Sequence, residues 1–335
     1  MPNAVTRAYQ SLASRSEDAL ARRGDAGKVV IQIGSATCEH AAGSRDVADE
    51  FAKHFASSGR EDVVLHRTGC TGRCSKEPIV GVSVPGKPPV KYERVDRELV
   101  HKIFTSHVQK GVPLPEHALD GSLAQPYEYE LVFCEGRRCR QRTGLKAAFE
   151  AKLAAAGIGP EKVKVNSHSC LGVCSDETEG ASTHVLVRPS KTIYRLASEA
   201  DLDALLEGPV GKGTVDERMK VPFKPIAQDF FDLYADVRFF NAQSRIAMRN
   251  AGIVDPESLE EYVRFGGFRA LAKCLEKGDP EWIVDEVLKA KLRGRGGGGF
   301  LTGQKWKFAR ANGEKTRYII CNGDEGDPGA FMDRG

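Results

Sequence analysis

The feature that most constrains the fold of this chain is a set of cysteines arranged as two short pairs, C-x4-C and C-x3-C. A stretch long enough to form a strand separates the pairs, so four thiolates can meet at one point. Gly136 and Gly172 lie inside the two pairs and allow each loop to fold back around a soft metal centre. The four cysteines are Cys134, Cys139, Cys170 and Cys174.

The same spacing occurs earlier in the chain with one member missing. Cys70 and Cys74 match Cys170 and Cys174, and we align Cys38 with Cys134, which leaves Gly43 in place of the fourth cysteine. His40 is a candidate replacement, because imidazole can ligate cluster iron. The alternatives are that His40 is an ordinary surface residue or that this site holds no metal.

The complete set is compatible with zinc, with an iron–sulfur cluster or with two disulfides. Structural zinc favours tight hooks of cysteines, whereas a two-iron cluster suits wider loops. Nine cysteines in a chain without a predicted export signal argue against a disulfide framework. Arginines near Cys134 and Cys139 would offset the negative charge of a cluster, or they lie on a solvated loop. These are Arg137, Arg138 and Arg140, and Arg73 and Lys76 flank the earlier cysteines in the same way.

The order of predicted elements repeats along the chain. Strands are expected at 29–34, 62–66, 79–84 and 90–92, with helices at 44–57 and 96–108. The second copy has strands at 128–133, 163–166, 183–187 and 192–195, with helices at 142–154 and 199–206. Both read as βαβ followed by ββα, so an internal repeat of one α/β domain is the simplest account.

The remaining segments differ from these copies. Residues 1–28 are expected to be a solvated, poorly ordered arm, and linkers rich in proline and glycine follow each copy. Asp255-Pro256 and Asp279-Pro280 are each typical of a helix N-terminus. The second of these helices leads into the glycine-rich stretch 293–300, and 318–321 is expected to end a buried strand.

Composition excludes several classes of protein. A net charge of +3 over 335 residues gives no indication of nucleic-acid binding. No apolar run approaches the length needed to cross a bilayer. We therefore expect a soluble, cytoplasmic protein without membrane insertion, located free or at the periphery of a membrane complex.

The chain resembles a known family over nearly all residues after 28. The βαβ–ββα order with cysteines in two loops is similar to the thioredoxin-like two-iron ferredoxins. GSATCEHAAGS and TGCTGRC in the first copy resemble the amino-terminal extension of flavin subunits from NAD(P)-linked hydrogenases and formate dehydrogenases. RGRGGGGFLTGQKW and YIICNGDEGDPGAFMDR are similar to the NADH-binding, FMN-carrying subunit of complex I.

The resemblance implies an α/β fold class with two tandem thioredoxin-like [2Fe-2S] ferredoxin domains, followed by the N-terminal part of an FMN/NAD(H)-binding domain. The implied boundaries are 1–28 for the arm, 29–110 for the domain with the incomplete cysteine set, 127–207 for the complete [2Fe-2S] domain and 226–335 for the flavin portion. Because the sequence stops at Gly335, inside that portion, we expect FMN binding to be weak and apolar surface to be exposed.

The resemblance also implies the site residues. One [2Fe-2S] cluster is expected on the complete cysteine set, whereas Cys38, Cys70 and Cys74 bind, or once bound, a second. Consecutive glycines allow close approach of a phosphorylated or flat ligand, and a lysine adds a point charge. No catalytic residue is assigned. The positions carried over for FMN are Gly294, Arg295, Gly296, Lys305, Asn322, Asp324 and Glu325.

Two functions are consistent with these expectations. In the first, the chain is the flavin subunit of an NAD(P)H dehydrogenase that acts with quinone, hydrogenase or formate dehydrogenase. Electrons would pass between NAD(P)H, FMN, the clusters and other subunits of a complex, in either direction. In the second, it is a non-catalytic ferredoxin-like carrier or docking module with an inert flavin segment. A structural zinc protein ranks after both.

Overall fold

A computed structural model describes most of the chain. The described residues are 3–25, 27–123, 127–135, 144–168, 171, 182–188, 190, 192–214, 216–221, 234, 237–241, 243, 245, 248, 250–314, 316, 318 and 320–326. The chain divides into two compact units. Gly24–Ser258 form one, and Met1–Arg23 with Leu259–Gly335 form the other.

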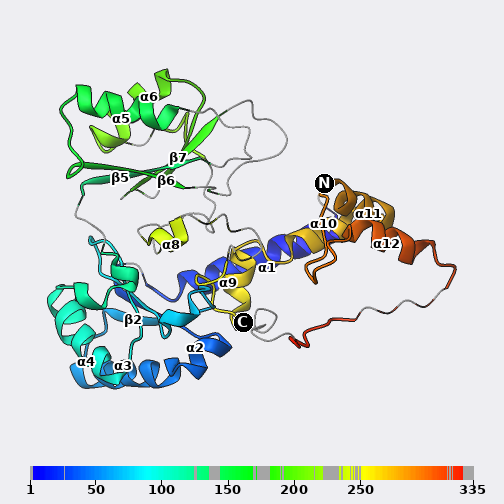
Figure 1. Ribbon diagram of the computed structural model, residues 1–335, viewed down its shortest axis with the longest axis horizontal. Helices are drawn as coiled ribbons and strands as arrows, with labels where there is room; N and C mark the ends of the chain where they lie inside the picture. The colour runs from blue at the N-terminus through cyan, green and yellow to red at the C-terminus, as the bar shows by residue number, and fades with distance from the viewer. Residues whose placement is uncertain are drawn as a thin grey trace. The chain divides into compact units, whose positions relative to one another are not determined.

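The first α/β domain contains a four-stranded sheet of order β2-β1-β3-β4. Its strands are β1 (Val29–Gly34), β2 (Val63–Thr68), β3 (Val80–Ser83) and β4 (Val90–Tyr92). β1 and β2 run parallel, with Val29 opposite Val63, whereas β3 is antiparallel to both β1 and β4. Helix α3 (Ser44–Ser58) connects the parallel pair, and α4 (Arg97–Lys102) continues as a π-helix over Ile103–Val108 (Figure 1).

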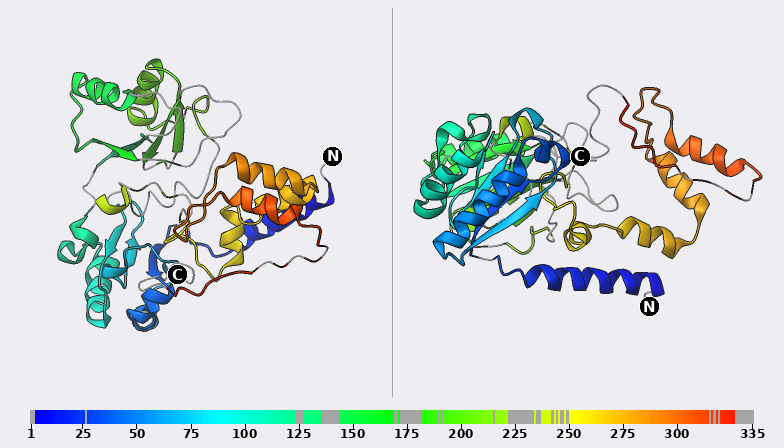
Figure 2. Two further views of the ribbon diagram at one scale, coloured as in Figure 1. Left: turned by 45° about the vertical axis from the view of Figure 1, so that its right-hand side comes forward. Right: turned by 90° about the horizontal axis from the view of Figure 1, so that it is seen from below.

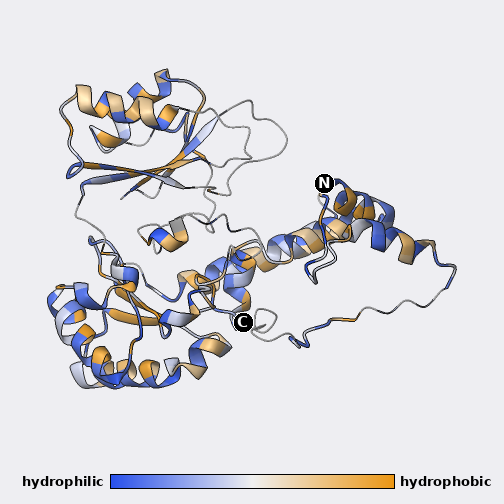
Figure 3. Ribbon diagram, viewed as in Figure 1, coloured by the Kyte–Doolittle hydropathy of each residue, from blue (hydrophilic) through white to orange (hydrophobic). Residues whose placement is uncertain are grey.

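Alternation along the strands builds the core of this domain. Val29, Ile31 and Ile33 point to one side of β1 and are buried beneath α3 and α4. Phe51 of α3 has no exposed surface and packs with its ring centroid 6.1 Å from that of Phe55. Figure 3 shows apolar residues recurring along the strands of both sheets. The core therefore follows the periods of two and 3.6 that the sequence displays.

The second α/β domain repeats this architecture with strand order β6-β5-β7-β8. Its strands are β5 (Tyr129–Cys134), β6 (Val163–His168), β7 (Thr183–Arg188) and β8 (Thr192–Leu196). Helices α5 (Leu145–Ala155) and α6 (Ala200–Leu205) lie on one face of the sheet, and a π-helix at Leu206–Val210 follows α6 (Figure 1). The predicted fold class, α/β with two tandem copies of one domain, is confirmed.

The other unit is helical in its described residues. It contains α1 (Ala4–Ala21), α9 (Leu259–Arg264), α10 (Arg269–Lys277), α11 (Pro280–Lys289) and α12 (Thr302–Ala311). Asp279 caps α11 by accepting a hydrogen bond from the amide of Glu281 at 3.0 Å, with Pro280 in the first turn as predicted. The short helix α8 (Arg238–Asn241) belongs to the unit with the sheets.

Two expectations for this unit are wrong. Residues 4–21 form helix α1, which runs beside α9 and α10 (Figures 1 and 2). Thr6 donates to Glu276 at 2.8 Å, and Arg23 pairs with Glu261, so packing and ion pairs order the segment expected to be an arm. The expected strand end near Cys321 is also not formed. Tyr318 and Ile320 are more than four-fifths exposed, because the described part of this unit contains no sheet for them to pair with.

Among the described residues, no helix combines the length and the apolar character that crossing a membrane requires.

Candidate metal centre and glycine-rich loop

The three cysteines of the first domain meet at one edge of its sheet. Cys38 lies in the short helix α2 (Thr37–Ala41) after β1, Cys70 follows β2, and Cys74 begins the 3-10 turn Cys74–Lys76. β1 and β2 are neighbouring parallel strands, so the loops after them start at the same edge. The sulfur atoms of Cys38 and Cys70 are 3.8 Å apart.

A carboxylate completes this group. Glu77 Oε1 lies 3.3 Å from the sulfur of Cys38 and 4.0 Å from that of Cys70. The ligand atoms of Cys38, Cys70, Cys74 and Glu77 all lie within 4.8 Å of one another. Glu77 was not among the ligands predicted from the sequence, although its place three residues after Cys74 on the same turn was a usable signal.

His40 is placed elsewhere. Its Nδ1 lies 3.1 Å from the hydroxyl oxygen of Ser44, one turn further along the chain, and His40 is not a member of the four-residue group. The fourth donor of the group is therefore the carboxylate of Glu77, whereas the sequence suggested the imidazole of His40.

Backbone hydrogen bonds hold the loop that carries Cys74 and Glu77. The amide of Arg94 donates to the carbonyl of Lys76 at 2.8 Å, and the amide of Val95 donates to that of Pro78 at 3.1 Å. The ammonium of Lys76 lies 2.6 Å from Glu93, and Arg73 pairs with Asp120 at 2.7 Å. Lys76 and Arg73, which flank the cysteines in the sequence, therefore each have a carboxylate partner.

Burial sets the electrostatics of the group when no cation is bound. Burial, with Glu77 and Cys70 nearby, raises the pKa of the Cys74 thiol to about 11, and burial also raises the pKa of Cys38. Burial raises the pKa of Glu77 as well, although hydrogen bonds from Cys38 and Cys74 act in the opposite direction. Four acidic donors gathered out of water favour a bound cation, which stabilises their deprotonated forms.

The strand registers correct the alignment of the two cysteine sets. Gly34 ends β1 opposite Thr68, and Cys134 ends β5 opposite His168 in the same parallel pairing. Gly34, and not Cys38, is therefore the counterpart of Cys134. Cys38 follows Gly34 by about the same interval as Cys139 follows Cys134. The missing thiol is the one at the end of the strand, and our alignment of Gly43 with the missing cysteine was wrong.

The second domain presents one of its four cysteines among the described residues. Cys134 is 3% exposed at the end of β5, and its sulfur accepts a hydrogen bond from the amide of Leu171 at 3.4 Å. Leu171 follows Cys170 directly in the sequence, so the residue after Cys170 lies beside Cys134. Outside the described residues lie Cys139, Cys170 and Cys174, together with Arg137, Arg138 and Arg140.

The glycine-rich loop is closed at its base. Arg293 and Leu301 form an antiparallel bridge, and the amide of Gly294 donates to the carbonyl of Phe300 at 2.9 Å. A Cβ atom built on any glycine from Gly296 to Gly299 would meet no atom within 4 Å, so the loop presents open backbone. Gly297 has a φ of 101°, which favours glycine at that position.

This loop leads directly into α12, whose first turn carries the exposed Lys305. An exposed backbone loop at a helix N-terminus with a nearby ammonium suits the phosphate of a flavin nucleotide. Asn322 and Asp324 form a local contact, in which the amide of Asp324 donates to Asn322 Oδ1 at 3.0 Å. The structure thus gives the loop side of the predicted FMN set, Gly294, Arg295, Gly296 and Lys305, as one continuous segment.

Gly303 fixes the packing of α12 on α11. A Cβ atom at this position would lie 2.6 Å from the backbone nitrogen of Leu288. Gly303→Ala is therefore expected to push the helices apart and destabilise this unit by about 1–3 kcal/mol. Trp282 and Trp306 lie on these two helices, so tryptophan fluorescence during urea unfolding measures the effect. Gly313→Ala is the control, because a Cβ there meets open space. Stabilisation by Gly303→Ala, as in an ordinary helix, would contradict the close approach.

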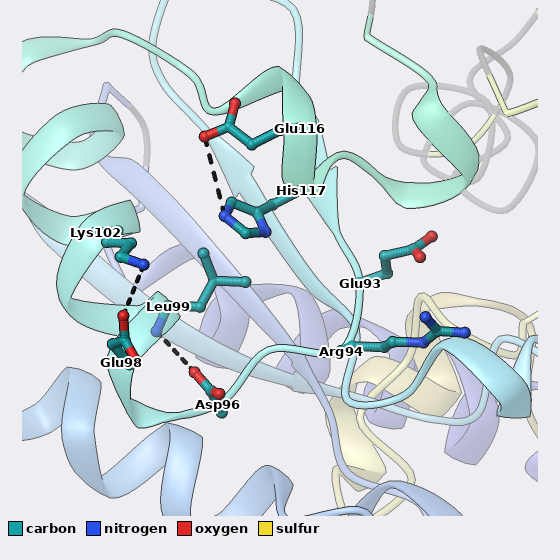
Figure 4. A pocket seen from close by; sticks show the side chains of 8 residues that line it. All are labelled: Glu93, Arg94, Asp96, Glu98, Leu99, Lys102, Glu116 and His117. Carbon is teal, nitrogen blue, oxygen red and sulfur yellow. Dashed lines mark hydrogen bonds and ion pairs between the residues drawn. The ribbon is translucent and has the colours of Figure 1, made fainter.

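A surface pocket of about 280 Å³ lies elsewhere in the first domain (Figure 4). Several of its side chains already have partners: Lys102 lies 2.7 Å from Glu98, and Asp96 caps α4 by accepting from the amide of Leu99 at 2.8 Å. The lining residues are Glu93, Arg94, Asp96, Glu98, Leu99, Lys102, Glu116 and His117. We read this pocket as a polar surface feature next to the backbone that supports the Glu77 loop.

Comparison with known proteins bears on the C-terminal segment. Residues 287–335 match the family described as Complex1_51K, the Nuo51 FMN-binding domain. The chain is 51% identical over 92 residues to NADP-reducing hydrogenase subunit HndC of Solidesulfovibrio fructosivorans. It is 56% identical over 77 residues to a subunit of the NADH-quinone oxidoreductase of Aquifex aeolicus.

These matches confirm the resemblance to flavin subunits. They cover 28% and 23% of this chain, and the chain spans only 18% of the length of each relative.

Solved structures give a weaker likeness. The wild-type thioredoxin-like [2Fe-2S] ferredoxin from Aquifex aeolicus overlaps 28% of this chain and 98% of its own, at 22% identity and a TM-score of 0.25. An NAD+-reducing [NiFe]-hydrogenase overlaps 63% of this chain and 33% of its own, at 24% identity and a TM-score of 0.22. At these TM-scores we draw no conclusion from the overlaps.

Proposed function

We propose that this chain is the electron-transfer portion of a flavin subunit in an NAD(P)H-linked oxidoreductase. The observation that carries the proposal is the match of residues 287–335 to an FMN-binding domain, in a chain whose two preceding domains place cysteines at a sheet edge. Bound FMN would accept a hydride from NAD(P)H and release single electrons, or work in the reverse direction.

The flavin end of this route rests on the loop before α12. Open glycine backbone and Lys305 would hold the phosphate, and we propose Asn322, Asp324 and Glu325 as partners for the ring or ribitol. The Arg293–Leu301 bridge closes the base of the loop and restricts its conformations before a ligand binds. Such preorganisation lowers the entropic cost of binding.

The cluster end rests on the second domain. We propose that Cys134, Cys139, Cys170 and Cys174 bind one [2Fe-2S] cluster. In support, Cys134 is buried at the strand end and accepts a hydrogen bond from the residue after Cys170. Hydrogen bonds to sulfur and exclusion of water are the means by which a protein tunes cluster potential.

The domain division proposed for this function is 29–110, 127–207 and 226–335. The named relatives are subunits of a hydrogenase and of an NADH-quinone oxidoreductase, so we propose that this chain also acts beside other subunits. We propose a cytoplasmic location, since reduced cysteines are required for metal ligation.

The first test is spectroscopic. Anaerobically purified protein should show the absorbance of a two-iron cluster and an electron paramagnetic resonance signal on reduction. Cys134→Ala should abolish both signals from the second domain, because one of four thiolate ligands is lost. Cys321→Ser, which changes an exposed cysteine, is the matched control and should leave them intact. A full signal in Cys134→Ala would contradict the ligand assignment.

A second measurement separates the enzyme from a simple carrier. Titration with FMN should quench flavin fluorescence, and Lys305→Ala should weaken binding, whereas Lys307→Ala on the same exposed helix should not. Cluster signals without any FMN binding would favour the alternative, a non-catalytic ferredoxin-like carrier or docking module.

A further inference from the structure

The metal group of the first domain differs in kind from the four-thiolate set of the second. Its strand-end position holds Gly34, and the carboxyl group of Glu39 fills the space that a side chain there would need. A Cβ atom on Gly34 would lie 2.2 Å from Glu39 Cδ. Glu39 is fully buried, and its Oε2 accepts from the amide of Ile79 at 3.2 Å. A cysteine at position 34 and this carboxyl group cannot both occupy the site.

Glu39 has a further property that points to a cation nearby. Its Oε1 has no hydrogen-bond partner although it is buried. A buried carboxyl group and a partly buried one beside three cysteines are costly to keep without a counter-charge.

The distances among the donor atoms of Cys38, Cys70 and Glu77 fit a single ion. For tetrahedral zinc with bonds of about 2.3 Å to sulfur and about 2.1 Å to oxygen, neighbouring donors lie about 3.6–3.8 Å apart. The observed separations are 3.8 Å between the sulfurs of Cys38 and Cys70, and 3.3 and 4.0 Å from Glu77 to these two sulfurs. A two-iron cluster places two of its ligands on each iron, so ligands on opposite irons lie further apart than ligands on one.

We propose that Cys38, Cys70, Cys74 and Glu77 bind one divalent ion of the zinc class, so that the first domain is a structural metal site and not an electron relay. Three thiolates and a carboxylate are a ligand set that zinc accepts, and the closed group leaves no position open for a substrate. This proposal does not rest on the flavin or on the cluster of the second domain.

A partly buried cation, Arg245, offsets part of the charge of this set. Arg245 donates to the carbonyl of Thr71, the residue after Cys70, at 3.2 Å. The guanidinium of Arg245 also interacts electrostatically with Cys70. Lys76 precedes Glu77 and is held near the loop by Glu93. Once the ion is bound, the site carries excess negative charge that these two cations reduce.

The test uses the full chain purified under reductant and dialysed against ZnCl2 or CoCl2. The background variant Cys170→Ser removes the proposed second-domain cluster. We expect one Zn²⁺ per chain, no acid-labile sulfide, and with Co²⁺ the intense visible bands of four-coordinate thiolate ligation. Glu77→Gln should weaken Zn²⁺ binding by more than about 100-fold, since groups outside the ligand shell already change affinity by about 10- to 100-fold.

The controls isolate the fourth ligand. Glu116→Gln changes an exposed carboxylate of the same compact unit, and Cys274→Ser changes a cysteine of the other unit. Both should bind Zn²⁺ as the parent does. Glu77→Cys should retain the ion and shift the Co²⁺ bands toward those of four thiolates, which keeps the test valid if Glu77→Gln folds poorly.

Three results would overturn the proposal. One is two irons with two sulfides retained in the Cys170→Ser background, which would show a cluster on the first domain. Another is the absence of any bound metal. The third is an unchanged Zn²⁺ affinity in Glu77→Gln. None of these three results decides the outcome of the Cys134→Ala experiment, so the proposed function is tested separately.

Discussion

Replacing Glu130 with alanine is expected to destabilise the second α/β domain by about 3–5 kcal/mol. The Glu130 side chain is 1% exposed on β5 and pairs with Arg188 of β7, whose own side chain is 10% exposed. Tyr127 also donates to Glu130 at 3.0 Å, and Lys164 lies 3.8 Å away. Removing the carboxylate would leave the guanidinium buried without its main counter-charge, which is the costly case for a buried pair.

The pH dependence of this pair has a definite sign. Burial opposes the charge of Glu130, but Arg188, Lys164 and Tyr127 together hold its pKa below the usual value. The folded state therefore releases this proton more readily than the unfolded state does. The resulting stabilisation is present above the unfolded pKa of about 4.3 and is lost as the pH falls through the lower folded pKa.

Hydrogen exchange measures the effect in the full chain. Both tryptophans lie in the other unit, so peptides from β5 and β7 are the better probe of this domain. In Glu130→Ala we expect their exchange to accelerate by about 100- to 4,000-fold at neutral pH, with first-domain peptides unchanged. Glu128→Ala removes an exposed carboxylate two residues earlier and should have little effect. Equal effects of the two variants would refute the importance of the buried pair.

Lowering the pH from 7 to 4 is expected to cost the first domain up to about 3 kcal/mol through one histidine. His107 is 1% exposed, and its Nδ1 lies 2.8 Å from the hydroxyl of Tyr92. That hydroxyl accepts from the amide of Leu114, and its own proton is available to Nδ1 of a neutral ring. Burial, with a smaller effect of Lys87, lowers the pKa of His107 to about 4.

The sign follows from proton binding. Below pH 6.5 the unfolded chain protonates this histidine while the folded domain does not, so stability falls until the pH reaches the folded pKa of about 4. His107→Gln keeps an acceptor for Tyr92 and should remove this part of the pH dependence, as measured by exchange of β3 and β4 peptides at both pH values. His117→Gln changes a more exposed histidine and should retain this part of the pH dependence. A full pH dependence in His107→Gln would assign the effect to other groups.

Local patterns in the sequence predicted most of the α/β architecture. Alternation in Val29–Gly34 and the apolar face of Ser44–Ser58 gave the first strand and helix within one or two residues. The proline at position 280 also marked the start of α11, because its fixed φ and its lack of an amide hydrogen suit a first helical turn. These features depend on neighbours along the chain, so the sequence displays them directly.

Features that depend on distant residues were predicted less well. Glu77 joins the cysteines because Cys38 and the loop after β2 converge at one sheet edge, and its place three residues after Cys74 was a signal that our cysteine pattern did not use. The strand register, not the sequence alignment, showed that Gly34 stands where Cys134 does. Helix α1 forms against α9 and α10, although its own sequence looks like a solvated arm.

The sequence by itself determined the repeated domain order, the supply of thiols and the resemblance to flavin subunits, because each is written in residue types and short spacings. Only the tertiary structure decided which donors share a site. Coordination depends on positions within a few ångströms, and residues such as Cys38 and Glu77 reach that separation only after the sheet has paired its strands.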